Sequence, residues 1–177
     1  MQNDMSDSEL TQWMRTADEN SFAERIERMR FLRNLYPKEQ GFLLFGGPML
    51  AEAIHEMQVS FIYGLDLACV LTAQVVIENL LDGTIDFFGS TVSKSGLKNL
   101  ARQSLDNNAI TESEYDAIER LRLIRNHYTH PQPFMEKGCL IKRCIDSSAS
   151  IDDTMRQDAE RAITTVVSIV SRPPYAV

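Results

Sequence analysis

With 177 residues, the chain is long enough for one domain whose core needs neither disulfides nor a structural metal. Its composition, 44% apolar and 24% charged, is that of a globular protein and excludes wholesale disorder. The net charge of −7 and the pI near 5.0 argue against sequence-blind binding of nucleic acid through a broad basic surface. A small, locally basic site is compatible with these totals.

The sequence carries no sign of export or membrane insertion. Its first residues are polar and acidic, unlike a secretory signal peptide. Cys69, Cys139 and Cys144 make an odd number of cysteines, which favours free thiols in a reducing compartment. The most apolar stretch, Val59–Leu81, has no uncharged run longer than Leu67–Ile77, and a bilayer requires roughly 20 residues. We therefore expect a cytoplasmic protein without a membrane segment.

The N-terminal region is predicted to hold two helices. A first short helix covers residues 6–16 and is capped by its first polar side chains. Ser21 and Glu24 have the spacing of a capping box, which opens a second helix. This helix is expected to end near Tyr36, because a proline follows, and residues 40–47 are expected to form a loop.

The central region is the most apolar part of the chain. Pro48 suits the first turn of a helix, and Gly64 interrupts the apolar pattern as a break or a close-packing point. Beyond it, residues 65–81 are apolar nearly all round, and Gly83 is placed to end this helix. A helix of this kind is expected at the centre of a bundle.

Two further elements are predicted before the last part of the chain. Residues 84–95 are expected to form a loop and residues 96–104 a modest helix. Thr111 and Glu114 form another capping box, and the helix that they open should run to about Thr129.

The C-terminal part completes the expected fold. Residues 132–150 are predicted to be irregular or to form a short hairpin, because Cys139–Ile145 has some strand character. Asp152 or Asp153 should cap a last helix that runs through about Ser171. The sequence therefore predicts an all-α fold, a single bundle of about five to seven helices with a small irregular or hairpin insert near 132–150.

The end of the helix before Pro131 carries the most chemical information. At about 100° per residue, Leu121 and Tyr128 lie on an apolar face, and Arg125 falls within that face. An arginine on a core face is costly unless it is paired. Arg125 is therefore expected to be committed to a structural or chemical partner.

Two more polar side chains belong to the same helix end. His130 directly precedes a proline, which places it at the helix C-terminus, where the helix dipole favours the protonated imidazole. Asn126 lies four residues earlier, on the adjacent face. A guanidinium, a carboxamide and an imidazole are thus expected near one another, a set that can bind a phosphodiester and transfer a proton.

This segment resembles a known signature. Arg125, Asn126 and His130 match the R-N-xxx-H form of the R-x4–6-H motif of the HEPN superfamily (higher eukaryotes and prokaryotes nucleotide-binding). Tyr63–Leu81 is similar to a long apolar helix that many of these domains carry, with a late glutamate at Glu78. Arginines and leucines lead into the motif and proline follows it, as in the family.

The resemblance covers about residues 48–171. It implies an N-terminal helical extension over residues 1–47 and a HEPN-like helical domain over residues 48–177, together one compact unit. It also implies a homodimer whose two motif sites share one cleft.

The activity that the resemblance implies is metal-independent cleavage of RNA, without a cofactor, in a defence or toxin–antitoxin setting with an antitoxin as a further partner. In that activity His130 takes or gives a proton, Arg125 stabilises charge on the phosphate and Asn126 orients either of them.

Other interpretations stay open. The family also contains non-catalytic modules that bind nucleotide, RNA or protein, or that dimerise, and the acidic pI favours such a role. Glu78 is predicted to form a buried, structural ion pair with Arg125. A zinc site would draw on two histidines and two cysteines at only loosely acceptable spacing, so we expect no metal. These ligands would be His127, His130, Cys139 and Cys144.

Overall fold

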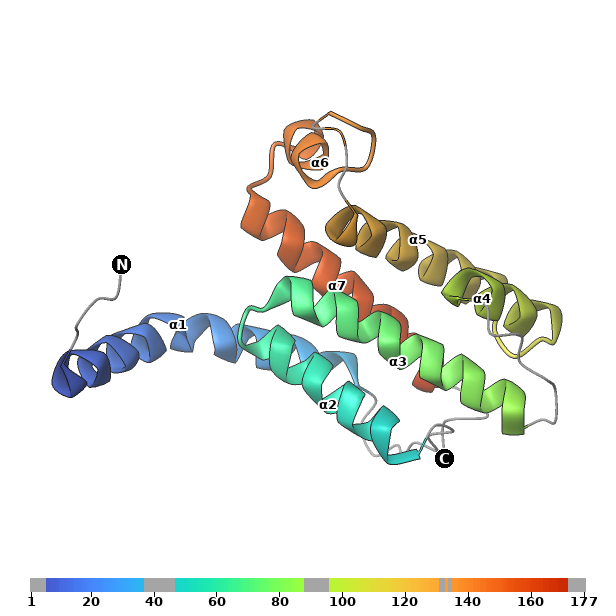
Figure 1. The fold of residues 1–177 in the computed structure, drawn as a ribbon, viewed down its shortest axis with the longest axis horizontal. Helices are drawn as coiled ribbons and strands as arrows, with labels where there is room; N and C mark the ends of the chain where they lie inside the picture. Colours follow the sequence, from blue (N-terminus) through green and yellow to red (C-terminus); the bar gives the residue numbers. More distant parts are fainter. Residues whose placement is uncertain (1–5, 37–46, 88–95, 131–132, 134, 172–177) are drawn as a thin grey trace.

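The computed structural model describes residues 6–36, 47–87, 96–130, 133 and 135–171, and in this part of the chain it contains seven α-helices and no strand (Figure 1). The helices, in chain order, are α1 (Asp7–Leu35), α2 (Gly47–Ile62), α3 (Asp66–Phe87), α4 (Leu97–Asp106), α5 (Glu112–Thr129), α6 (Leu140–Ser147) and α7 (Ile151–Val170). The predicted all-α bundle is confirmed.

Helix α3 lies at the centre of the bundle. It packs against α2, α4, α5 and α7, and its most extensive contacts are with α2 and α7. Fully buried side chains on α3, such as Ile77 and Leu80, meet equally buried residues of α7, such as Ile163. Among the described helices, α3 alone has the length and mean hydropathy, 1.3, of a membrane span, but 56% of that window is buried inside the protein. Packing within the bundle accounts for its apolar composition.

Helix α1 differs from the prediction of two helices. It is one continuous helix of 29 residues, and its capping box joins Ser6 and Glu9. The predicted box at Ser21 does not form, because Ser21 lies inside the helix and donates its hydroxyl to the carbonyl of Asp18 at 3.2 Å. No glycine or proline stands in 16–21 to stop the helix. Most of the predicted loop over 40–47 lies outside the described residues.

Two glycines of the central region behave differently from each other. Gly64 adopts φ +73 and separates α2 from α3, as a glycine break should. Gly83 was expected to end α3, but the helix continues to Phe87. Its last turns are held by burial of Ile85 and by a hydrogen bond from the Thr84 hydroxyl to the Leu80 carbonyl at 2.6 Å. Residues 84–87 of the predicted loop are therefore helical, and 88–95 lie outside the described residues.

The C-terminal part contains one confirmed cap and two corrections. Thr111 and Glu114 form the predicted capping box of α5. The predicted hairpin is wrong, because 140–147 form α6. The Cys139 sulfur caps the N-terminus of this helix by accepting a hydrogen bond from the Lys142 amide. Ser150, rather than Asp152 or Asp153, caps α7, since its hydroxyl accepts the amide of the third helical residue at 2.9 Å.

A buried arginine fastens α1 to the turn between α2 and α3. Arg28 is 3% exposed, and its guanidinium donates to both carboxylate oxygens of Asp66, at 2.5 and 3.1 Å. It also donates to the Phe61 carbonyl at 3.1 Å and to the Glu24 carboxylate at 2.9 Å. The guanidinium lies 5.0 Å from the centre of the Phe61 ring. These bonds occupy the buried guanidinium and give the buried Asp66 carboxylate its counter-ion.

Breaking this pair should destabilise the fold. We expect Arg28→Ala to lower the free energy of unfolding by about 3–5 kcal/mol, because Asp66 would be left buried without its counter-ion. Urea denaturation followed by circular dichroism measures the change. The control is Arg102→Ala, which removes an exposed pair with Asp106 and should cost about 0–1 kcal/mol. Equal losses in the two variants would contradict the structural role of Arg28.

The predicted free thiols are confirmed for all three cysteines. Cys69 is fully buried on α3, and burial, followed by the nearby Asp66 carboxylate, raises its pKa to about 12. Cys144 is only partly buried.

Alkylation should distinguish these thiols. At pH 8 we expect iodoacetamide to modify Cys144 in the folded protein and Cys69 only on unfolding, as peptide mass spectrometry would record. Because the raised pKa belongs to the folded state, the unfolded chain loses the Cys69 proton first. Stability should therefore fall as pH rises from about 9 towards about 12. Rapid labelling of Cys69 in the native protein would contradict the prediction that Cys69 is alkylated only on unfolding.

Candidate functional site

The three motif residues lie at the C-terminal end of α5. His130 is the C-cap residue with extended backbone angles, φ −120 and ψ 135, and its amide donates to the Asn126 carbonyl at 3.0 Å. Its side chain is exposed and makes no hydrogen bond or ion pair with the described residues. The imidazole is therefore open to a ligand at the place that the sequence predicts.

Arg125 points from α5 towards α3 and is partly buried, as its place on the apolar face predicts. Its Nε donates to Oε1 of Gln74 at 2.6 Å, and its Nη1 donates to Oδ1 of Asn126 at 3.2 Å. The Nη2 group has no partner among the described residues. Two of the guanidinium nitrogens therefore fix the side chain, and the third is free to donate to an added anion.

The predicted ion pair between Glu78 and Arg125 is not found among the described residues. Gln74 lies between them, since its Nε2 donates to Oε1 of Glu78 at 2.8 Å while its Oε1 accepts from Arg125. Gln74 stands one turn before Glu78 on α3 and is 4% exposed. Because an amide is both donor and acceptor, this glutamine can satisfy both neighbours without bringing their charges into contact.

A second polar cluster, which the sequence reasoning missed, joins α5, α6 and α7. Asp158 of α7 is fully buried and accepts two hydrogen bonds from Arg143, at 2.8 and 2.6 Å, and one from the Tyr128 hydroxyl at 2.7 Å. Burial and then the bond to Asp158 raise the pKa of Tyr128. Asp158 precedes buried Ala162 and Val166 by one and two turns, so an acid on that core face signalled a buried partner.

His127 faces the loop before α6 instead of solvent. Gly138 passes so close to it that an added Cβ would lie 2.5 Å from Nε2 of His127, and Gly138 has φ +94. Nδ1 of His127 is buried without a hydrogen-bond partner in the described structure. This histidine therefore belongs to the packing between α5 and the loop, at one end of a groove.

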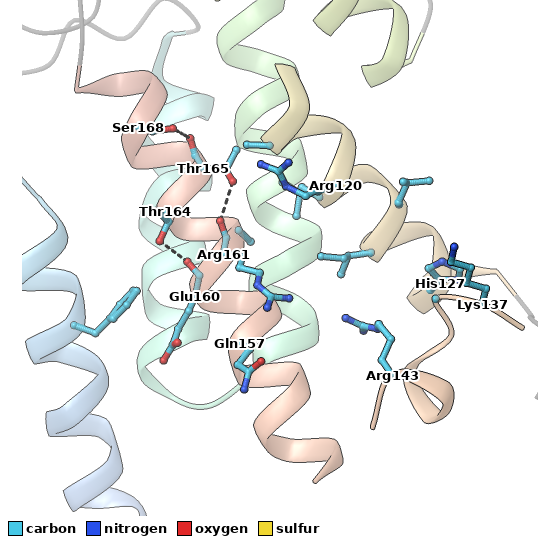
Figure 2. A pocket seen from close by; sticks show the side chains of 17 residues that line it. Arg120, His127, Lys137, Arg143, Gln157, Glu160, Arg161, Thr164, Thr165 and Ser168 are labelled. Atoms are coloured by element: carbon cyan, nitrogen blue, oxygen red, sulfur yellow. Dashed lines mark hydrogen bonds between the residues drawn. The ribbon is translucent and has the colours of Figure 1, made fainter. Parts of the chain in front are cut away.

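The groove runs between α5 and α7 and has a volume of about 1220 Å³ (Figure 2). Figure 2 shows Arg120 on α5 and Arg161 on α7 at its sides, with Arg143 and Lys137 near the His127 end. The rest of the lining combines apolar side chains, such as Leu121 and Phe31 of α1, with polar side chains of α7, including the acidic Glu160. In a chain of net charge −7, this is a local gathering of cations.

The groove and the motif occupy different faces of α5. None of Arg125, Asn126 and His130 lines the groove, and Arg125 turns towards α3. The motif can bind an anion and transfer a proton, whereas the groove offers apolar surface between cations. In the described part of the chain, no group of three or more His, Cys, Asp or Glu side chains is placed to hold a metal ion.

Comparison with protein-family models, with curated proteins and with solved structures finds no match to this chain.

The stability of two variants can distinguish the link through Gln74 from a direct ion pair between Glu78 and Arg125. Glu78→Gln keeps an acceptor for the Gln74 amide, so it should change the free energy of unfolding by less than about 1 kcal/mol. Gln74→Leu should cost about 1–3 kcal/mol, because it leaves Nε of Arg125 without its partner. Chemical denaturation of both variants measures the difference. A loss of about 3–5 kcal/mol in Glu78→Gln would instead indicate a buried ion pair.

Proposed function

We propose that the protein is a HEPN-like, metal-independent endoribonuclease that acts in a defence or toxin–antitoxin setting in the cytoplasm. The observation that carries the proposal is the geometry at the end of α5. There Gln74 and Asn126 hold Arg125, Nη2 of Arg125 is unpartnered within the described structure, and the imidazole of His130 is exposed. A held cation and an open acid–base group at the same helix end are the two kinds of group that cleavage of a phosphodiester requires.

The proposed reaction uses the ribose 2′-hydroxyl of the substrate as the nucleophile. The 2′-oxygen bonds to phosphorus, the bond from phosphorus to the 5′-oxygen breaks, and the products carry a 2′,3′-cyclic phosphate and a 5′-hydroxyl. His130 takes the proton from the 2′-hydroxyl or gives one to the leaving 5′-oxygen. Arg125 stabilises the negative charge that develops on the phosphoryl oxygens, and Asn126 orients the guanidinium.

A homodimer would complete the site by supplying both a proton donor and a proton acceptor. The surface of α3 beside the motif supports this, because Leu67 and Val75 are 39% and 46% exposed and lie on one side of the helix. Glu78 follows Val75 by three residues, so this apolar stripe leads towards Gln74 and Arg125. Burying it between two copies would bring two α5 ends together. An antitoxin is a further proposed partner.

A non-catalytic HEPN-like module is the second candidate. It would bind nucleotide, RNA or a protein partner through the same residues and dimerise without turnover. The net charge of −7 favours it, since a nuclease benefits from a positive field around its substrate. The hydrogen bonds of Arg125 to Gln74 and Asn126 also favour the non-catalytic module, because they occupy two of the guanidinium nitrogens.

Incubation of the protein with RNA in EDTA tests the proposal. We expect cleavage to proceed without metal, to leave 2′,3′-cyclic phosphate ends and to spare DNA, which lacks the nucleophile. His130→Ala should lower the rate by a factor of about 10² to 10⁴ with the fold intact, because the positioned acid or base is lost. Gel assays and mass spectrometry of the product ends measure these effects.

The matched control is His55→Ala, which removes an exposed histidine of α2 and should leave the rate unchanged. Full activity in His130→Ala, cleavage of DNA, or activity that EDTA abolishes and Mg²⁺ restores would contradict the mechanism. A wild-type protein that binds RNA without cutting it would favour the non-catalytic module.

A further inference from the structure

The N-terminal half of α1 projects from the bundle and carries an exposed apolar stripe (Figure 1). Every residue from 6 to 20 is exposed. Leu10, Trp13 and Met14 are 45%, 61% and 55% exposed, although they share one face of the helix. We call residues 6–22 the arm. Three large apolar side chains on one unpaired face indicate a surface that binds something.

The stripe of the arm continues a face that is already used for packing. Trp13 precedes Phe31 by 18 residues, and Met14 precedes Leu32 by 18 residues, which is about five helical turns. In the C-terminal half of α1, Leu32 is buried in the core and Phe31 packs against it. The same face therefore rests on the bundle over one half of its length and extends beyond it over the other half.

The groove between α5 and α7 is the matching unfilled surface on the same chain. Its apolar lining includes Leu121 and Leu123, and Leu123 is 49% exposed. Arg120 and Lys137 are at its edge and are exposed, without an ion pair to any described residue. Arg161 has a side chain that is 65% exposed and lies 3.6 Å from Asp158. The groove thus offers apolar surface between cations.

The apolar stripe of the arm is shorter than this groove, and the arm complements the groove in charge. The stripe from Leu10 to Met14 is about 6 Å long, and the part of α7 that lines the groove, from Gln157 to Ser168, is about 16 Å long, so the groove has room for it. Asp7 and Asp18 flank the stripe and are exposed; Asp18 also pairs with Arg25 at 3.3 Å, and Arg15 is a cation within the arm. The acids of the arm, which outnumber Arg15, complement a groove in which Arg120, Lys137, Arg143 and Arg161 outnumber Glu160.

We propose that the arm of one copy docks into the α5–α7 groove of a second copy, reciprocally, so that two chains exchange arms. The arm cannot reach the groove of its own chain, because α1 is one unbroken helix that leads away from the bundle. RNA would pair with the cations but leave the apolar lining uncovered. The contact uses a face of α5 other than the one occupied by Arg125, so it does not depend on the proposed cleavage of RNA.

Trp13 is the sole tryptophan of the chain, so its fluorescence reports arm docking directly. As the protein concentration rises, its emission should move to shorter wavelength, in step with the growth in mass seen by light scattering. Leu123→Glu places a charge in the groove and should raise the dissociation constant of the arm contact at least about 10-fold, which removes the shift. Met49→Glu, at an apolar position on α2 that is 74% exposed, is the matched control and should keep the shift.

Mixing two variants gives a sharper test. Leu123→Glu keeps its tryptophan but has a blocked groove, whereas Trp13→Ser has an intact groove and no tryptophan. Each alone should show no shift in emission, and adding Trp13→Ser to Leu123→Glu should restore it, because a single arm–groove contact can then form. Melting curves of both variants should match the wild type, since both positions are exposed.

Three results would overturn the proposal. The first is Trp13 emission that does not change with concentration. The second is a shift that survives Leu123→Glu, and the third is no recovery in the mixture. If Leu123→Glu instead abolishes binding of RNA while Trp13 stays in water, the groove belongs to nucleic acid. Whether the wild type cleaves RNA is read separately through His130→Ala, so failure of one proposal leaves the other intact.

Discussion

The ion pair of Arg28 with Asp66 is the contact on which the arrangement of α1 depends. Asp66 is the first residue of α3, so the arginine binds the start of the central helix, while its bond to the Phe61 carbonyl binds the end of α2. An isolated buried charge would be costly, and the bidentate geometry with added acceptors offsets that cost. One side chain thereby orients a 29-residue helix on the bundle, and the direction in which the arm leaves follows from it.

Local signals predicted helices well wherever tertiary packing agreed with them. The capping box at Thr111 forms, because Thr111 truly begins a helix, while the same pattern at Ser21 is overridden by a helix that enters from Ser6. Gly64 interrupts the helix, whereas Gly83 does not, because the helical turn after Gly83 buries Ile85. The sequence pattern alone does not show how much free energy the burial of such a side chain contributes. The segment 140–147 was misread because a short apolar run is compatible with either a strand or a helix.

For the candidate site too, local sequence patterns predicted some features, whereas features that depend on tertiary packing could not be predicted. Helical periodicity was enough to place Arg125 on the face towards the core, and the proline that follows His130 was enough to place this histidine at the helix end. It could not identify Gln74 as the partner of Arg125, because the choice between two polar residues one turn apart on α3 depends on the distance between helices. The groove could not be predicted from the sequence either, because it is formed by α5 and α7 together with the loop in which Gly138 lies close to His127.

The continuity of α1 has a thermodynamic consequence. Helix nucleation is costly while elongation is cheap, and the half of α1 held by Arg28 supplies the nucleus for the half whose residues 6–20 are all exposed. The two halves therefore belong to different cooperative units. Amide hydrogens of the anchored half should exchange only when the bundle opens, whereas those of the exposed half exchange by fraying from Ser6 inwards. A proline placed in the exposed half would melt it without reaching the core, so this helix can lose its outer turns while the protein as a whole stays folded.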